Sequence, residues 1–139
     1  MAGQVAPQFS IKMFDGTKTS LADYRGKVLV INYWATWCGP CKAEMPMMSW
    51  YHRKYRDRGF EIVGVVTEDS VPKFQLRAVV AALSYPLASK LSGKYGIINN
   101  SVPTSYVIDR AGRIRYAKAG SFTPEEFIGV VGPLLDEPG

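Results

Sequence analysis

Residues 28–34 read VLVINYW, and Asn32 is the only strongly polar side chain among them. A strand that is apolar on both of its faces belongs in the centre of a sheet that is covered on both sides. A second run of this kind, EIVGVVT, occupies residues 61–67. The intervening stretch predicts a helix from about Cys38 to Arg58, with Gly59 as its stop. Strand–helix–strand order indicates a parallel pair joined by a right-handed crossover, and hence an α/β fold.

The remaining segments predict a hairpin at each end of the domain and three further helices. Asp15-Gly16 suits the turn of a hairpin within residues 9–21, and Ala111-Gly112 joins the strands expected at 104–109 and 113–120. Helices are expected at 71–83, from the apolar positions Leu76, Val79, Val80 and Leu83, at 89–95, and from Thr123 onward.

The last helix has the clearest start signal. Thr123 and Glu126 have the spacing of a capping box, and Pro124 stands where its missing N–H does no harm. Pro133 is expected to end or kink this helix. Together the elements predict one α/β domain over residues 1–139, with a mixed central sheet, helices on both faces and an N-terminal β-hairpin.

The only two cysteines of the chain, Cys38 and Cys41, follow the first buried strand and open the predicted helix. Unpaired N–H groups and the helix dipole stabilise negative charge there, which for a cysteine is the thiolate. Cys38 is therefore the expected nucleophile for disulfide exchange, and Cys41, one turn further on, the residue that resolves a mixed disulfide. Gly39 leaves room for a substrate, and Pro40 presets the backbone of the first helical turn.

Other interpretations of the cysteine pair are weaker. A structural disulfide closing so short a loop would restrict the unfolded chain little. A zinc site needs more soft ligands, and the chain offers a single histidine, His52, unless two chains share the metal. His52 is expected to be a partly exposed helix residue without a chemical role.

The charge pattern argues against a nucleic-acid partner. The net charge is +5, and aromatic residues do not alternate with basic ones as they would on a base-stacking surface. The most basic stretch, 51–58, is expected to be a solvated helix face. No apolar run approaches the roughly 18 residues of a membrane span, and residues 1–9 lack the pattern of a signal peptide. We therefore expect either a cytosolic protein or one whose targeting segment is absent from this chain.

The motif WCGPC resembles the active site of thioredoxin. The longer stretch LADYRGKVLVINYWATWCGPCKAEMP is more similar to the extracytoplasmic thioredoxin-like reductases of bacteria, the TlpA/ResA type, as are YPLASKLSGKYGI and VPTSYVIDRAGRI. The resemblance extends from about residue 9 to 131. It implies a thioredoxin fold and the roles given above for both cysteines. It also implies a cis peptide between Val102 and Pro103 facing them, where the Val102 backbone would pair with an extended substrate segment.

Two positions depart from thioredoxin. Asn32 stands where thioredoxin has a buried aspartate, and Glu44 matches a glutamate of the ResA members. Glu44 lies three residues beyond Cys41, so the two share a helix face. It either tunes or receives the proton of Cys41, directly or through water, or is a solvated first-turn glutamate that favours the helix dipole. Trp34 is expected in the core, and Trp37 on the surface beside the active site.

The resemblance implies a thiol-disulfide oxidoreductase that reduces protein disulfides outside the cytoplasm, for example in cytochrome c maturation or copper-centre assembly. No dissociable cofactor is needed, because the Cys38–Cys41 pair carries the electrons, and a membrane-bound thiol reductase would recharge it. A cytosolic general thioredoxin is the alternative within this class. Peroxide reduction and a non-enzymatic copper chaperone, with Cu(I) on two thiolates, are alternatives from other classes. The direction of electron flow depends on the reduction potential, which the sequence leaves open.

Overall fold

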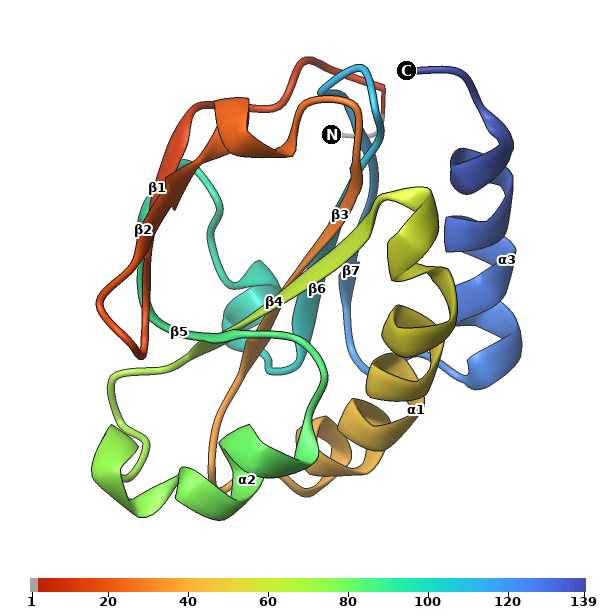
Figure 1. The fold of residues 1–139 in the computed structure, drawn as a ribbon. Helices are drawn as coiled ribbons and strands as arrows, with labels where there is room; N and C mark the ends of the chain where they lie inside the picture. Colours follow the sequence, from red (N-terminus) through yellow and green to blue (C-terminus); the bar gives the residue numbers. More distant parts are fainter. Residues whose placement is uncertain (1–2) are drawn as a thin grey trace.

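The computed structural model describes residues 3–139. The predicted domain and the stretch 1–9 both begin with Met1 and Ala2, which lie outside the described residues. The described chain forms a seven-stranded sheet in the order β2-β1-β5-β4-β3-β6-β7 (Figure 1). The strands are β1 (Phe9–Met13), β2 (Lys18–Ser20), β3 (Val28–Trp34), β4 (Phe60–Val66), β5 (Leu87–Gly93), β6 (Thr104–Ile108) and β7 (Ile114–Ala119).

Parallel and antiparallel pairs are mixed, as predicted. The β3 strand runs parallel to β4 over its whole length, from Val28 opposite Phe60 to Trp34 opposite Val66. The β4–β5 pair is parallel too, whereas β1–β2, β1–β5, β3–β6 and β6–β7 are antiparallel. Both predicted hairpins are present, the first turning at Gly16 with a φ of 89°.

Three α-helices and four short 3-10 helices complete the described chain. The α-helices are α1 (Gly39–Tyr55), α2 (Arg77–Ala82) and α3 (Pro124–Asp136), and the 3-10 helices are η1 (Leu21–Tyr24), η2 (Arg56–Arg58), η3 (Lys73–Gln75) and η4 (Ile98–Asn100). Gly59 stops the α1–η2 unit in the left-handed region, with a φ of 80°, and the capping box at Thr123 forms as predicted.

The helix α3 continues through Pro133 to Asp136, so of the two expected outcomes, an end or a kink at Pro133, the end was wrong and the kink stays a prediction. Proline removes one backbone hydrogen bond from a helix interior. Leu134 and Leu135, which follow it, are buried against the sheet, and their burial stabilises the last turn.

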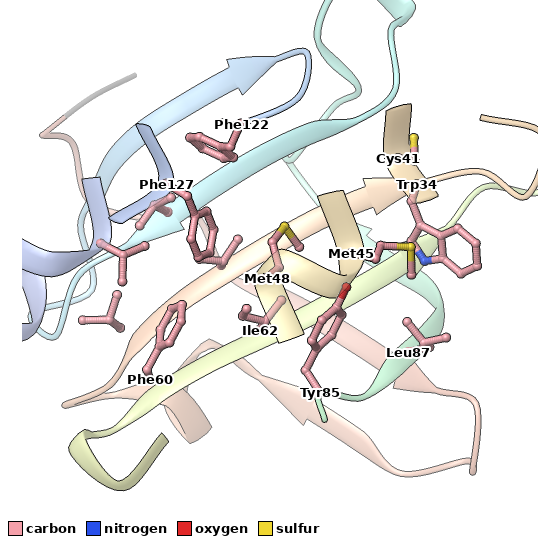
Figure 2. Packing of buried hydrophobic residues seen from close by; sticks show 14 of the residues in the cluster. Trp34, Cys41, Met45, Met48, Phe60, Ile62, Tyr85, Leu87, Phe122 and Phe127 are labelled. Atoms are coloured by element: carbon pink, nitrogen blue, oxygen red, sulfur yellow. The ribbon is translucent and has the colours of Figure 1, made fainter. Parts of the chain in front are cut away.

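The sheet separates two hydrophobic cores. Val28, Val30 and Trp34 of β3 face the first core, which includes apolar residues of α1 and α3 such as Met48 and Phe127. Figure 2 shows this core, with Cys41 at the end marked by Trp34 and with Phe60 and Phe127 toward the other end. Leu29, Ile31 and Tyr33 face the second core, whose cover comes from η1, η4 and the N-terminal hairpin rather than from an α-helix. The mixed sheet with helices on both faces is confirmed, but the second face carries only 3-10 helices.

Two helix predictions were wrong. The stretch 89–95 lies mostly in strand β5, because Leu87 and Ala88 pair with β4 and the strand then continues beside β1. The predicted helix 71–83 is reduced to η3 and the six residues of α2. Of its expected apolar face, Leu76 is buried but Val80 is 44% exposed, so little burial supports a longer helix.

The expectation of a partly exposed His52 was also wrong, since only 3% of the residue is exposed. Its Nδ1 lies 2.8 Å from Ser84 Oγ and its Nε2 lies 3.0 Å from Glu61 Oε1. Glu61 belongs to β4 and Ser84 to the connection after α2, so His52 ties α1 to both. Its polar contacts explain how an imidazole is accommodated in the core.

The two ends of the described chain lie at the same edge of the sheet (Figure 1). Val5 forms a bridge with Arg113, and Ala6 N donates to Gly112 O. Arg110, in the same turn, donates through Nη2 to Leu135 O in the last turn of α3. This edge is where β3 begins, so it is opposite the edge at which β3 ends and the cysteines follow.

Candidate active site

Cys38 and Cys41 form a disulfide at the N-terminus of α1, with their Cα atoms 5.3 Å apart. Cys38 is the N-cap residue, with an extended backbone, and the backbone N–H of Cys41 donates to Cys38 Sγ at 3.2 Å. Gly39 and Pro40 form the first helical turn as predicted, and a Cβ on Gly39 would meet open space. The buried strand β3 therefore delivers the pair to the carboxyl edge of the sheet, where open α/β sheets bind their ligands.

The two cysteines differ in accessibility. Both belong to the first hydrophobic core, but Cys38 keeps 5% of its surface exposed, whereas Cys41 is completely buried. An external reactant therefore reaches the disulfide from the side of Cys38.

The loop before β6 lies against Cys38. The Val102–Pro103 peptide is cis, as the resemblance implies, and the carbonyl oxygen of Val102 lies 3.7 Å from Cys38 Sγ. Pro103 itself is buried and leads into β6. Val102 and the cysteine pair, distant in the sequence, thus meet at one place.

A polar network holds the segment before Cys38 in position. Trp37 is 62% exposed, as expected for a residue beside the site, and its Nε1 donates to Asp69 Oδ2 at 3.1 Å. Thr36 is bound through its backbone N–H to Ser70 Oγ and through its own Oγ1 to the N–H of Val71. The connection after β4 therefore braces the active-site loop. Trp34, in contrast, is buried as predicted.

Glu44, three residues beyond Cys41 in α1, lies in a buried network. Only 4% of the residue is exposed, and it lies in the second turn of α1, which contradicts the solvated first-turn alternative. Its Oε1 accepts from Asn32 Nδ2 at 3.0 Å, and its Oε2 accepts from the backbone N–H of Phe122 at 2.9 Å. Asn32 Nδ2 also donates to Ser105 Oγ at 2.9 Å. The strand β3 and the turn before α3 thus bind the Glu44 carboxyl group directly, and β6 holds Asn32 through Ser105.

Burial raises the pKa of the Glu44 carboxyl above its ordinary value. The hydrogen bonds from Phe122 and Asn32 and the positive charge of Lys118 oppose this shift but do not cancel it. A groove of 360 Å³, lined by Glu44 together with Pro40, Ala43, Met47 and the turn 121–124, opens beside the carboxyl group. Glu44 is thus a perturbed acid that borders a solvent-accessible hollow.

Sequence reasoning identified Asn32 and Glu44 but missed three partners. Asp69 fixes Trp37, and Ser105 and the backbone of Phe122 complete the Glu44 network. Ser105 could have been noticed in the sequence, since it is a polar residue inside the buried strand β6. No sequence pattern marks a backbone N–H such as that of Phe122, because any residue type except proline supplies one.

Within residues 3–139, no group of three or more His, Cys, Asp or Glu side chains is arranged to hold a metal ion. Over the same residues, no helix is long and apolar enough to cross a membrane.

Comparison with known proteins gives a consistent result. The model of the AhpC/TSA family matches residues 2–117. The thioredoxin-like protein YneN of Bacillus subtilis is 36% identical over 129 residues, covering 89% of this chain and 75% of the relative. The thiol-disulfide oxidoreductase ResA of Bacillus thuringiensis is 33% identical over 131 residues, covering 91% and 75%.

A crystal structure supports the same assignment. The thiol:disulfide interchange protein of the thioredoxin family from Chlorobium tepidum superimposes with a TM-score of 0.77 at 28% identity, covering 95% of this chain and 96% of that one. The predicted thioredoxin-like fold is confirmed. The chain therefore belongs to the AhpC/TSA family of thioredoxin-like proteins, and is a thiol-disulfide oxidoreductase of the ResA type.

Proposed function

We propose that this oxidoreductase reduces disulfides of protein substrates outside the cytoplasm, with Cys38 as the attacking and Cys41 as the resolving cysteine. The observation that carries the proposal is the unequal burial of the pair: Cys38 keeps accessible surface at the helix N-terminus, whereas Cys41 is enclosed behind it. Of the two residues, only Cys38 offers surface to a partner disulfide.

The reaction starts from the dithiol form and proceeds in two steps. The Cys38 thiolate attacks one sulfur of the substrate disulfide, and the other substrate sulfur leaves as a thiolate that takes up a proton. Cys41, after losing its proton, attacks Cys38 Sγ, which forms the Cys38–Cys41 disulfide and releases the second substrate thiolate. Two electrons pass from the cysteine pair to the substrate, and the structure has the geometry of the oxidised product.

The N-terminus of α1 supports the thiolate of Cys38. The N–H of Cys41 already points at Cys38 Sγ, at 3.2 Å, and the helix dipole adds a favourable potential for negative charge. Both effects favour the thiolate form of a cysteine at this position. They also stabilise Cys38 as the leaving group when Cys41 or a reductant attacks.

Glu44 is the proposed acceptor of the Cys41 proton, directly or through a water molecule. Its raised pKa suits this role, because a general base works best when its pKa is near the working pH. Asn32 and the N–H of Phe122 would position the carboxylate, and the groove beside Glu44 would let the proton reach solvent.

The backbone at Val102 and Pro103 is the proposed binding edge for the substrate. Because Val102 O lies 3.7 Å from Cys38 Sγ, an extended segment paired with Val102 would bring its own cysteine to Cys38. No dissociable cofactor takes part in this scheme. A membrane-bound thiol reductase would return electrons to the pair, and apocytochrome c or a copper-centre assembly protein are the proposed targets by family resemblance.

Substitution of each cysteine separately tests the assignment. Incubated with a protein disulfide, Cys41→Ser should accumulate a mixed disulfide through Cys38, whereas Cys38→Ser should form none and lose turnover. A mixed disulfide formed through Cys41 in the Cys38→Ser variant would contradict the proposed roles.

A glutathione redox titration tests the direction of electron flow. A reductant should have a potential nearer the roughly −270 mV of thioredoxin than the roughly −120 mV of a strong oxidant of the same fold. A value above about −180 mV would instead favour an oxidase or isomerase. Rapid peroxide consumption, or stoichiometric Cu(I) binding without disulfide exchange, would support the alternative classes.

A further inference from the structure

A cleft of 470 Å³ opens beside the cysteine pair, on the sheet face opposite α1. Trp37 and Val102, which flank the disulfide, form one end of it. Its other walls include Tyr33 of β3, Glu68 after β4, and Lys90 and Leu91 of β5. We call it the β4–β5 cleft.

The cleft exists because β4 and β5 are paired over only a short part of their length. β4 and β5 pair only at Gly64 with Leu87 and at Val65 with Ala88. β5 then continues along β1 as far as Gly93, after a register shift in β1 between Lys12 and Met13. The two strands therefore separate toward the carboxyl edge, and the space between them is open at the end nearest Cys38.

The interior of the cleft is apolar and rigid. Tyr33 is buried, and its hydroxyl donates to Tyr95 O at 2.7 Å, which fixes the ring. Val65 is buried and Leu91 partly so. Trp37 stands at the entrance, more than half exposed yet held by Asp69. Tryptophan is one of the residue types that are enriched at binding hot spots.

The rims are charged, and unequally so. Glu68 and Asp69 line the β4 side and Lys90 the β5 side, which leaves a formal charge of −1 on a chain whose net charge is +5. Asp69 already accepts from Trp37 and Thr67. Within residues 3–139, the side chains of Glu68 and Lys90 form no hydrogen bond or ion pair, so both remain available to a ligand.

We infer that the β4–β5 cleft binds the substrate segment next to the cysteine under attack, and that it selects an apolar side chain flanked by a basic residue. The inference rests on the proposed function. A segment paired at Val102 has its cysteine at Cys38, and its neighbouring side chain then meets the apolar interior. The next residue meets the β4 rim, where two carboxylates favour a positive charge.

The test compares two disulfide peptides that both carry leucine beside the cysteine and differ only in the following residue, lysine or glutamate. For the parent, kcat/KM should be about fivefold higher with the lysine peptide, the order expected for a surface charge pair, and the ratio should fall as salt is added. Replacing leucine by glycine in the lysine peptide should raise KM.

Charge reversal at the rim provides the decisive variant. Glu68→Lys should invert the ratio between the two peptides, and because the readout is a ratio, a general change in rate cancels. Asp57→Lys is the control, because it makes the same change of net charge far from the cleft. Asp57 lies in η2, at the edge of the sheet where β4 begins, and this variant should keep the ratio of the parent. Equal rates with both peptides, preference of the parent for glutamate, or no inversion in Glu68→Lys would overturn the inference.

A small neutral disulfide, bis(2-hydroxyethyl) disulfide, separates this outcome from failure of the proposed function. If the parent reduces it but does not discriminate between the peptides, only the cleft inference fails. If the parent reduces neither the small disulfide nor the peptides, the proposed function fails.

Discussion

At the scale of single residues, the structure explains why the carboxyl group of Glu44 is tolerated in the interior of the protein. Glu44 has lost nearly all contact with solvent, and two hydrogen-bond donors replace the water. A buried charge without such partners would cost several kcal/mol. The raised pKa shows that the replacement is incomplete, so Glu44 holds a proton at a higher pH than an exposed glutamate does.

Glu44→Gln tests the proton transfer. The variant cannot accept a proton from Cys41, so the pH dependence of disulfide exchange should change shape relative to the parent, with slower exchange where Cys41 is a thiol. The measurement is the rate of exchange from acidic to alkaline pH with one substrate. Superimposable profiles would reject a role for Glu44 in the chemistry.

The raised pKa of Glu44 also predicts how the free energy of unfolding depends on pH, and Glu44→Gln tests it. Between the pKa of an exposed glutamate and the raised pKa of Glu44, the folded protein holds a proton that the unfolded chain has released. The free energy of unfolding should therefore fall as pH rises through this window, and Glu44→Gln should lack that part of the fall. Denaturant titrations of both oxidised proteins at several pH values measure it, and parallel pH curves would contradict the raised pKa.

The sequence predicted those site residues whose role depends on local order along the chain. Cys38, Cys41 and the helix start follow from a strand ending directly before the motif. Glu44 was indicated by the resemblance to the ResA members, and helical spacing places it on the same face as Cys41. Ser105 and Phe122 could not be assigned in this way, because Ser105 contacts Asn32 from 73 residues further along and Phe122 contacts Glu44 from 78 residues further along. Only tertiary packing brings them there.

At the scale of elements, the local sequence pattern predicted the secondary structure correctly for strands that are buried. It failed for β5, whose structure is determined by pairing with neighbouring strands. β3 and β4 are almost wholly buried, and their apolar sequences predict this directly. β5 is mostly exposed after Ala88, and its sequence contains the serines, lysine and glycine of a turn or short helix. It is a strand because β1 and β4 offer hydrogen bonds on its two sides, which no property of residues 87–93 predicts.

Gly64 in β4 shows how closely these elements approach. A Cβ at this position would lie 2.8 Å from Leu87 Cδ2 and 3.3 Å from Trp34 Nε1. Gly64→Ala should destabilise the protein by about 1–3 kcal/mol through overpacking, measured by denaturant unfolding.

A glycine in open space provides the matched control. Gly129 lies in the interior of α3, and a Cβ added to it would have no neighbouring atom within 4 Å. Gly129→Ala should stabilise the protein by about 0.5–1 kcal/mol, because alanine restricts the unfolded chain and favours the helix. Destabilisation of similar size in both variants would contradict the crowding argument.

At the scale of the whole molecule, the two hydrophobic cores share one sheet, each core being lined by one of its faces. Loss of the sheet would therefore disrupt both cores. Side chains of β3 alternate between them, which makes the strand common to both. The predicted single domain should therefore unfold in one cooperative step. Far-UV circular dichroism and tryptophan fluorescence should give coincident denaturant transitions, whereas separate midpoints would indicate two independently stable units.

The position of the chain ends has a consequence for how the molecule could be displayed. Both ends of the described chain lie by the turn that contains Arg110 and Gly112. The helix α1, of which Cys38 is the N-cap, begins at the far edge of the sheet (Figure 1). A tether fused to either end, whether to a bilayer, a bead or a sensor chip, would therefore present the redox sulfur outward to passing proteins. Immobilisation by an end tag should thus preserve access to the reactive face.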